Sequence, residues 1–216
     1  MADENEPKPK GRPKDPGKRM SILHAARSLF LEHGLAVVSM DAIAEQAGVS
    51  KATVYSHYAD KSALFRAVLE AETGDYSPPP QIDKLEKLED LRQHLVDFGS
   101  SLVLVLTRPG VVDLGRLLVN EAHRHPDQAT HFFARGPEAT HLMLAAMLSK
   151  ANEQQLIACD NCKLASDHLL SMWLGQRHLR QQLGLCPPPT SREVRRHVAA
   201  CVDVILAAFK CNRSRK

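Results

Sequence analysis

The sequence of 216 residues has no apolar run that approaches the ~18 residues needed to cross a membrane, and its start lacks the apolar core of a secretory signal. The five cysteines are odd in number and lack the spacing of a small disulfide scaffold, which favours reduced thiols. Enzyme motifs are also missing: there is no G-x-S-x-G, no H-E-x-x-H, no phosphate-binding loop and no outstanding carboxylate pair. We therefore expect a cytoplasmic protein that is not an enzyme and needs no cofactor.

Neither sign of charge dominates, because 28 Lys and Arg residues face 25 Asp and Glu residues for a formal net charge of +3, but the charges are unevenly distributed. Residues 1–17 are rich in Pro, Lys and Gly, and we expect a flexible basic arm there. Within it Gly11-Arg12-Pro13, flanked by lysines, resembles the core of an AT-hook, which predicts that Arg12 enters an A·T-rich minor groove. A basic tail that only improves solubility is the alternative.

The stretch from Ser39 to Tyr58 predicts two short helices joined by a tight turn. Ser39 and Ser50 are good N-caps, because a serine hydroxyl can accept an otherwise unpaired backbone N–H. Gly48 follows the last periodic residue, as a helix-ending glycine does. One apolar stripe runs along the first helix: Met40, Ile43, Ala44 and Ala47. A helix, a glycine-containing turn and a second helix through Tyr58 make a helix-turn-helix.

The second of these helices is equipped for DNA. No residue from 50 to 59 is acidic, whereas a helix that faces only water usually carries both signs. Lys and Tyr side chains can hold phosphates, Thr and Ala can touch a thymine methyl group, and Lys can read guanine. The donors and rings in and just after this helix are Lys51, Thr53, Tyr55, Ser56, His57, Tyr58 and Lys61. For Tyr58 we expect a mixed role, partly in the core.

The segment GVSKATVYSHYADKSALF resembles the signature of TetR/AcrR-type transcriptional regulators, as do the preceding SMDAIAEQAG and RMSILHAARSLFLEHG. The resemblance covers residues 18 to 72 and implies a DNA-binding repressor. Asp41 is an unusual neighbour for phosphate, so we assign it a capping role. With the donors above, the resemblance gives these predicted DNA-binding residues: Ser39, Met40, Ser50, Lys51, Ala52, Thr53, Tyr55, Ser56, His57, Tyr58 and Lys61, with Arg12 of the arm.

The rest of the chain also shows helical periodicity and no strand alternation, so we predict an all-α protein. Three consecutive prolines at 78–80 end any helix and mark a domain junction. We expect a DNA-binding domain at 18–76 and a ligand-binding and dimerisation bundle at 84–211. Pro137 suits the first turn of a helix, with Phe132 and Phe133 in a short connection before it. The remaining helices are expected at 18–33, from 61, 88–106, 111–123, 162–183 and from 191, the last opened by a capping box at Thr190.

The segment RLLVNEAHRHPDQATHFFARG, at 116–136, resembles the C-terminal domain of one TetR/AcrR subgroup, whose members mostly repress efflux pumps. The resemblance implies a homodimer on a palindromic double-stranded DNA operator, released by a small-molecule effector. We expect the dimer to form through the last two helices, since the last one is too apolar to leave exposed. Its apolar face comprises Val194, Val198, Cys201, Val202, Ile205 and Phe209.

Two further groups of residues allow either a site or plain structure. A ligand pocket could be lined by Phe98, Leu102, Met143, Met147, Met172 and Trp173, although such residues at helical spacing are more often core. Cys159 and Cys162 form a lone C-x-x-C, with His168 as a possible third zinc ligand, but incidental loop cysteines are favoured, so we assign no metal site. Arg116 and Glu121 are expected on the surface. The rival function is a helix-bundle protein that binds small molecules or senses thiols or metals without a DNA role.

Overall fold

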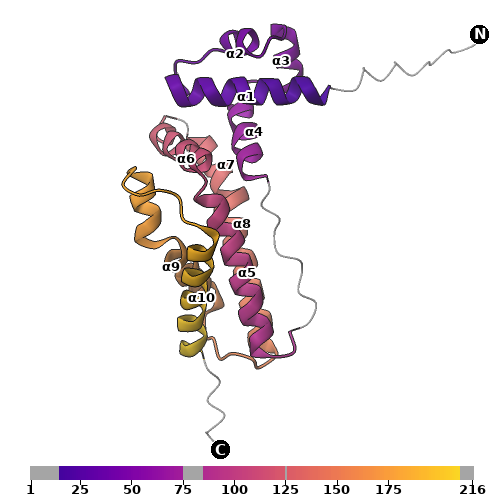
Figure 1. The fold of residues 1–216 in the computed structure, drawn as a ribbon. Coiled ribbons are helices and arrows are strands. Elements are labelled where there is room, and N and C mark those ends of the chain that lie inside the picture. Colours follow the sequence, from indigo (N-terminus) through magenta and orange to yellow (C-terminus); the bar gives the residue numbers. More distant parts are fainter. Residues whose placement is uncertain (1–14, 75–84, 125, 210–216) are drawn as a thin grey trace, which may run out of the picture. The chain divides into compact units, whose positions relative to one another are not determined.

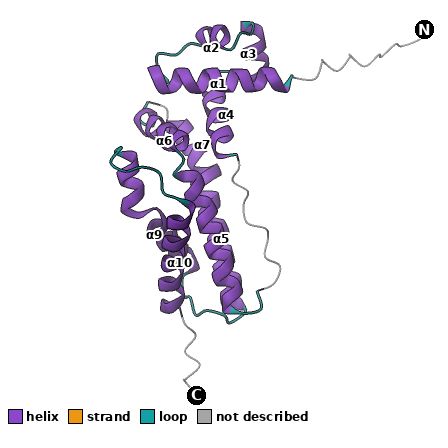
Figure 2. Cartoon of the chain, viewed as in Figure 1, coloured by secondary structure: helices purple, strands orange, loops and turns teal. Residues whose placement is uncertain are grey.

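The computed structural model describes residues 15–74, 85–124 and 126–209. Within these ranges every regular element is a helix, which confirms the all-α fold (Figure 2). The chain divides into two compact units, residues 1–68 and 69–216. No helix in the described ranges is both long and apolar enough to cross a membrane.

The first unit contains α1 (Pro16–His33), α2 (Met40–Gln46), α3 (Lys51–His57) and most of α4 (Lys61–Thr73). α1 begins two residues before the expected start, because the Asp15 carboxylate accepts the Gly17 N–H at 2.9 Å and Pro16 takes the first helical position. Gly34, with φ of +79°, ends the helix where the sequence predicted.

The core of this unit is small and draws on all four helices. Phe30 of α1 meets Phe65 of α4 edge to face, with ring centroids 5.7 Å apart. Leu29 of α1 is only half-buried. The fully or almost fully buried residues around the aromatic pair are Ile22, Ala26, Ile43, Ala44, Val54 and Leu64.

The helix-turn-helix forms as its caps predict. Gly48 adopts a positive φ of 65° just beyond α2, and the Val49 N–H then bonds the Ala44 carbonyl at 3.0 Å. α3 ends at His57, one residue earlier than predicted, and Tyr58 is its extended C-cap.

The second unit is a helical bundle (Figure 1). Its elements are α5 (Leu88–Leu106), α6 (Pro109–Glu121), α7 (Pro126–Phe133), a π-helical turn (Ala134–Glu138), α8 (Ala139–Glu153), α9 (Cys162–Gln182) and α10 (Ser191–Ala208). α10 packs along α5 and beside α9, and α8 packs on α9. The predicted capping box is present: the Thr190 hydroxyl accepts the Glu193 N–H, and the Glu193 carboxylate accepts the Thr190 N–H at 2.8 Å.

Two local expectations for this unit are wrong. Phe132 and Phe133 lie in α7 rather than in a connection, and Pro137 lies inside a helical run instead of opening one. A proline has no N–H for the carbonyl four residues back and its ring crowds that carbonyl, which a wider π turn tolerates. α9 is also interrupted, because Gly175 has φ of 47° and ψ of −157°.

The apolar face of α10 is used within the protomer. Val194, Val198, Cys201 and Ile205 are each at most 8% exposed and belong to one core cluster with α5, α8 and α9. These residues are therefore covered within the protomer, and the dimer through the last two helices stays a prediction. The exposed residues of α10 include charged side chains and, at helical spacing, one apolar stripe that comprises Ala200, Val204 and Ala207.

Candidate DNA interface

α3 has two distinct faces. Val54 is fully buried and anchors the helix on the core. Lys51, Ala52, Tyr55 and Ser56 are exposed and lie at i, i+1, i+4 and i+5, which places them on one side of an α-helix. These four residues form what we call the outer face of α3. It presents an ammonium, a methyl, a phenol and a hydroxyl group side by side.

The serine and threonine hydroxyls are already hydrogen-bonded within the motif. The Ser39 oxygen accepts the Ala42 N–H at 3.1 Å, and the Ser50 oxygen accepts the Thr53 N–H at 3.2 Å. The Ser50 and Thr53 hydroxyls also bond each other at 2.8 Å, and Ser56 donates to the Thr53 carbonyl at 2.7 Å. These groups therefore fix the ends of α2 and α3, which in turn orients the outer face.

Two predicted contact residues lie in the core instead. Met40 and Tyr58 are each only 8% exposed. Met40 belongs to the apolar stripe of α2, and Tyr58 follows Val54 by four residues on the inward side of α3. Burial leaves these two side chains little surface for DNA, and the predicted contacts of Met40 and Tyr58 stay a prediction. His57 is half-buried beside them.

Asp41 has a role that the sequence did not reveal. Its carboxylate oxygens lie 2.8 Å from the Nζ of Lys51, so an ion pair links the start of α2 to the start of α3. This hydrogen bond raises the pKa of Lys51. The residues are ten apart in sequence, and only the folding back of the turn brings them together. The capping interpretation of Asp41 left out this partner.

Lys61 also makes hydrogen bonds within the protein. Its Nζ donates to the carbonyls of Ala36 and Val38, at 3.1 and 2.8 Å. These carbonyls lie between α1 and α2, so Lys61 ties that connection to the start of α4. Arg12 lies outside the described residues, and its predicted contact with the minor groove stays a prediction.

Comparison with known proteins finds a matching family model for each of the two units. Residues 22–68 match the family model of bacterial regulatory proteins of the tetR family, and residues 93–211 match the C-terminal domain of AefR-like transcriptional repressors. The chain belongs to the TetR family. The TetR family consists of transcriptional regulators, so the sequence resemblance is confirmed.

Two solved structures and one curated protein illustrate the similarity. The flavonoid-responsive regulator FrrA is 33% identical, and the two structures align over 90% of this chain and 98% of that chain with a TM-score of 0.72. A regulator from Pseudomonas syringae pv. tomato is 26% identical, with a TM-score of 0.69 over 90% of this chain and 97% of that one. The HTH-type regulator YdeS of Bacillus subtilis is 36% identical over 48% of this chain, which spans only about half (50%) of YdeS.

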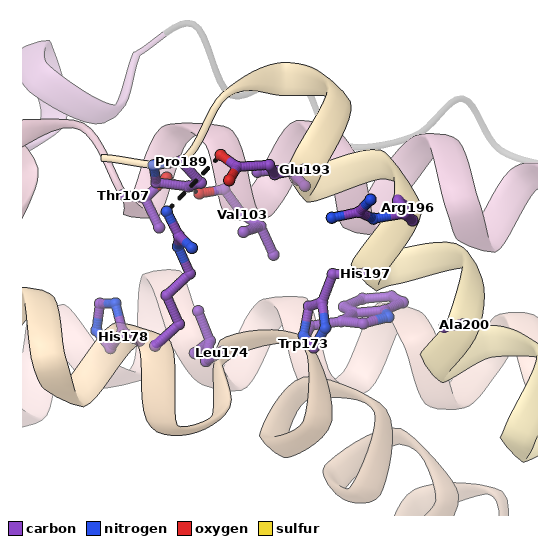
Figure 3. Close-up of a pocket in the computed structure, with 12 residues that line it drawn as sticks. Val103, Thr107, Trp173, Leu174, His178, Pro189, Glu193, Arg196, His197 and Ala200 are labelled. Carbon is purple, nitrogen blue, oxygen red and sulfur yellow. Dashed lines mark hydrogen bonds and ion pairs between the residues drawn. The ribbon is translucent and has the colours of Figure 1, made fainter. Parts of the chain in front are cut away.

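The six predicted ligand-binding residues lie in or against the core of the second unit. Phe98, Leu102, Met147 and Trp173 are buried in the main cluster, and Met143 and Met172 pack on it half-buried. Trp173 alone among the six also lines a cavity of about 340 Å³ between α5, α9 and α10 (Figure 3). The other residues around this cavity were not singled out from the sequence as ligand contacts.

Cys159 of the C-x-x-C pair is not activated. Cys159 is buried, and burial raises the pKa of its thiol to about 11. Cys162 donates to the Cys159 carbonyl at 3.8 Å. Within the described ranges, no three His, Cys, Asp or Glu side chains are grouped so that they could hold a metal ion.

Proposed function

We propose that this chain is a repressor that binds a palindromic operator as a homodimer and is released by a small-molecule effector. Its family membership supports the regulatory role, and the outer face of α3 carries the proposal. In a helix-turn-helix, the second helix enters the major groove. The outer face offers a donor for phosphate or guanine at Lys51, a methyl group at Ala52 and a phenol at Tyr55.

The direct test is to retain fragments of the protein's own genome on the purified chain and to sequence them. Two tyrosines give a matched pair of variants for the selected fragment. Tyr55 is 45% exposed, whereas the Tyr58 hydroxyl is buried and has no hydrogen-bond partner among the described residues. Tyr55→Phe should weaken binding by roughly 2- to 10-fold, which corresponds to one hydrogen bond of ~0.5–1.5 kcal/mol. Tyr58→Phe should leave the affinity unchanged, and equal effects would remove the outer face from the interface.

The dimer is proposed to use the exposed sides of α9 and α10. Ala200, Val204 and Ala207 of α10 are short enough to let two helices approach closely, and Val204 is 61% exposed. A symmetric dimer would present two copies of the outer face to two half-sites. Val204→Glu should dissociate the dimer without unfolding the protomer, because it places two like charges in the interface.

A control for this variant lies on α6. Val119 is 70% exposed and far in sequence from the proposed surface, so Val119→Glu should stay dimeric. Light scattering measures both variants. A wild-type monomer that binds a full palindrome tightly would overturn the proposed dimer. Repression is tested separately, by a reporter under the selected fragment, whose expression should fall when the chain is present.

A further inference from the structure

Asp41 and Lys51 form a pair of opposite charges at the edge of the outer face of α3. Both oxygens of the Asp41 carboxylate lie 2.8 Å from Nζ of Lys51. The pair is nevertheless open to solvent, because the Lys51 side chain is 60% exposed and the Asp41 side chain 62%. A large partner can therefore reach both charged groups while they remain bonded to each other.

Stability and phosphate binding give little reason for this pair. An exposed ion pair contributes little to stability, and Ser39 and Ser50 already cap α2 and α3. Near a DNA backbone the Asp41 carboxylate repels phosphates and compensates the charge of Lys51, which weakens binding that is independent of sequence. The pair is better suited to the uncharged edges of bases, which offer both donors and acceptors.

Each member of the pair keeps hydrogen-bonding capacity for such an edge. An ammonium has three N–H donors, whereas an ionised carboxylate has about four acceptor sites on its two oxygens. Lys51 needs at most two N–H groups to bond both oxygens of Asp41, so at least one N–H stays available. Asp41 likewise retains acceptor sites. The pair thus presents a donor and an acceptor side by side.

The spacing of this donor and acceptor matches the major-groove edge of a G·C base pair. Guanine presents the acceptors N7 and O6 there, and cytosine presents the N4 amino donor. O6 and N4 are joined by a hydrogen bond of the base pair itself, so about 2.9 Å separates them. Lys51 can therefore donate to O6 while Asp41 accepts from N4, at the 2.8 Å separation that the two groups already have.

We propose that Asp41 and Lys51 together read one G·C base pair in each half-site, with Lys51 on the guanine and Asp41 on the cytosine. The inference rests on the proposed function and names a base pair that its interface recognises. A C·G or A·T pair places an amino group against Lys51 and a carbonyl against Asp41, so both are rejected. A T·A pair keeps the right order of acceptor and donor but has a methyl group in place of N7, which makes it second best.

The selected genomic fragment supplies the operator for the test. Each position of one half-site is changed in turn to the other three base pairs, and fluorescence anisotropy gives the dissociation constant of the full chain on each labelled duplex. At one position, wild type should bind G·C about tenfold more tightly than C·G or A·T, with T·A between them. Replacing that guanine by 7-deazaguanine, which lacks N7, should remove part of this advantage.

Two variants separate the roles of the pair, and a third is the matched control. Asp41→Asn should lose most of the preference by binding the C·G and A·T duplexes more tightly, because an Asn side chain donates as well as accepts and the freed Lys51 can turn to a phosphate. A gain in binding does not arise from misfolding. Lys51→Met should lose the preference by binding the G·C duplex more weakly. Glu45→Gln removes the same charge from an exposed position one turn further along α2 and should keep the preference.

Three results would overturn the inference: no position with this order of base pairs, an unchanged preference in Asp41→Asn, or an equal loss in Glu45→Gln. Equal weakening of every duplex by Lys51→Met would also overturn it, because Lys51 would then hold a phosphate. In all of these cases wild type still binds the operator and the proposed function stands. A chain that retains no genomic fragment would instead overturn the proposed function and this inference together.

Discussion

Gly99 of α5 offers a stringent test of the core of the second unit. A Cβ atom built there would lie 2.7 Å from Cε2 and Cζ2 of Trp173 and 2.8 Å from Cγ1 of Val198. Carbon atoms in contact prefer about 3.5–4.0 Å. Trp173 is only 1% exposed, and Phe98 holds it edge to face at 6.0 Å, so the indole has little room to retreat. Gly99→Ala must therefore displace helices rather than a flexible side chain.

The magnitude follows from two opposing effects. Overpacking a tight core costs about 1–3 kcal/mol, whereas replacing a mid-helix glycine by alanine contributes about 1 kcal/mol of helix propensity. Because the clash involves a rigid ring, we expect the upper part of that range and a net loss of about 2 kcal/mol. Gly115 of α6 is the matched control, since its nearest neighbour would be Nε2 of Gln182 at 3.6 Å, an ordinary contact. Gly115→Ala should gain about 0.5–1 kcal/mol.

Urea unfolding followed by circular dichroism, at one protein concentration, measures the free energy of unfolding of both variants. The double variant Gly99→Ala/Trp173→Phe should lose less than the sum of its parts, because the smaller ring removes the clash. A Gly99→Ala protein as stable as Gly115→Ala would show that the close approach of α5 and α9 is not tight, and the reasoning would fail.

Other predictions concern the first unit and pH. Lys61→Met should lower the free energy of unfolding by about 1–3 kcal/mol, because the Lys61 ammonium donates to two loop carbonyls. The salt dependence of DNA binding should not change. A shallower salt slope would instead indicate that Lys61 contacts a phosphate. Asp41→Asn should release Lys51 and steepen the slope of log affinity against log salt by about 0.9, and weaker binding would contradict this. The Arg92 bond to Asp203 lowers the pKa of that carboxyl, so its stabilisation is complete above the unfolded pKa of about 3.9 and is lost as pH falls through the lower folded pKa. Arg92→Met should accordingly be less stable than wild type at pH 7 and should approach it in acid.

Local patterns predicted the helices well because their causes are local. The caps at Ser39, Ser50 and Thr190 and the positive φ at Gly48 depend on residues within four positions, and each appears as expected. The prediction that Pro137 opens a helix was wrong because this local signal is ambiguous. A proline is compatible with a first turn but also with a π turn inside a longer run, and the sequence around it does not distinguish the two.

The candidate DNA interface was predicted less completely, because residue type does not reveal direction. Donors and rings crowd α3, but Val54 anchors the helix on the core, and Tyr58, the extended residue just beyond the helix, is buried as well. Lys51 and Lys61 were predicted as cations free to meet DNA, yet each has a protein partner that is ten or more positions away in sequence. Such partners emerge only from the turn and from the packing of α4.

The proposed dimer contact on α10 lies on a different side of the helix from its apolar face. An apolar stripe indicates that a helix buries one face, but it does not say what covers that face. Here α5 covers it, since Val198 and Val202 are fully buried within one protomer. A partner can only use the remaining side, where Ala200, Val204 and Ala207 follow one another at helical spacing. A charge at Cys201 would therefore test folding of the protomer, and a charge at Val204 tests association.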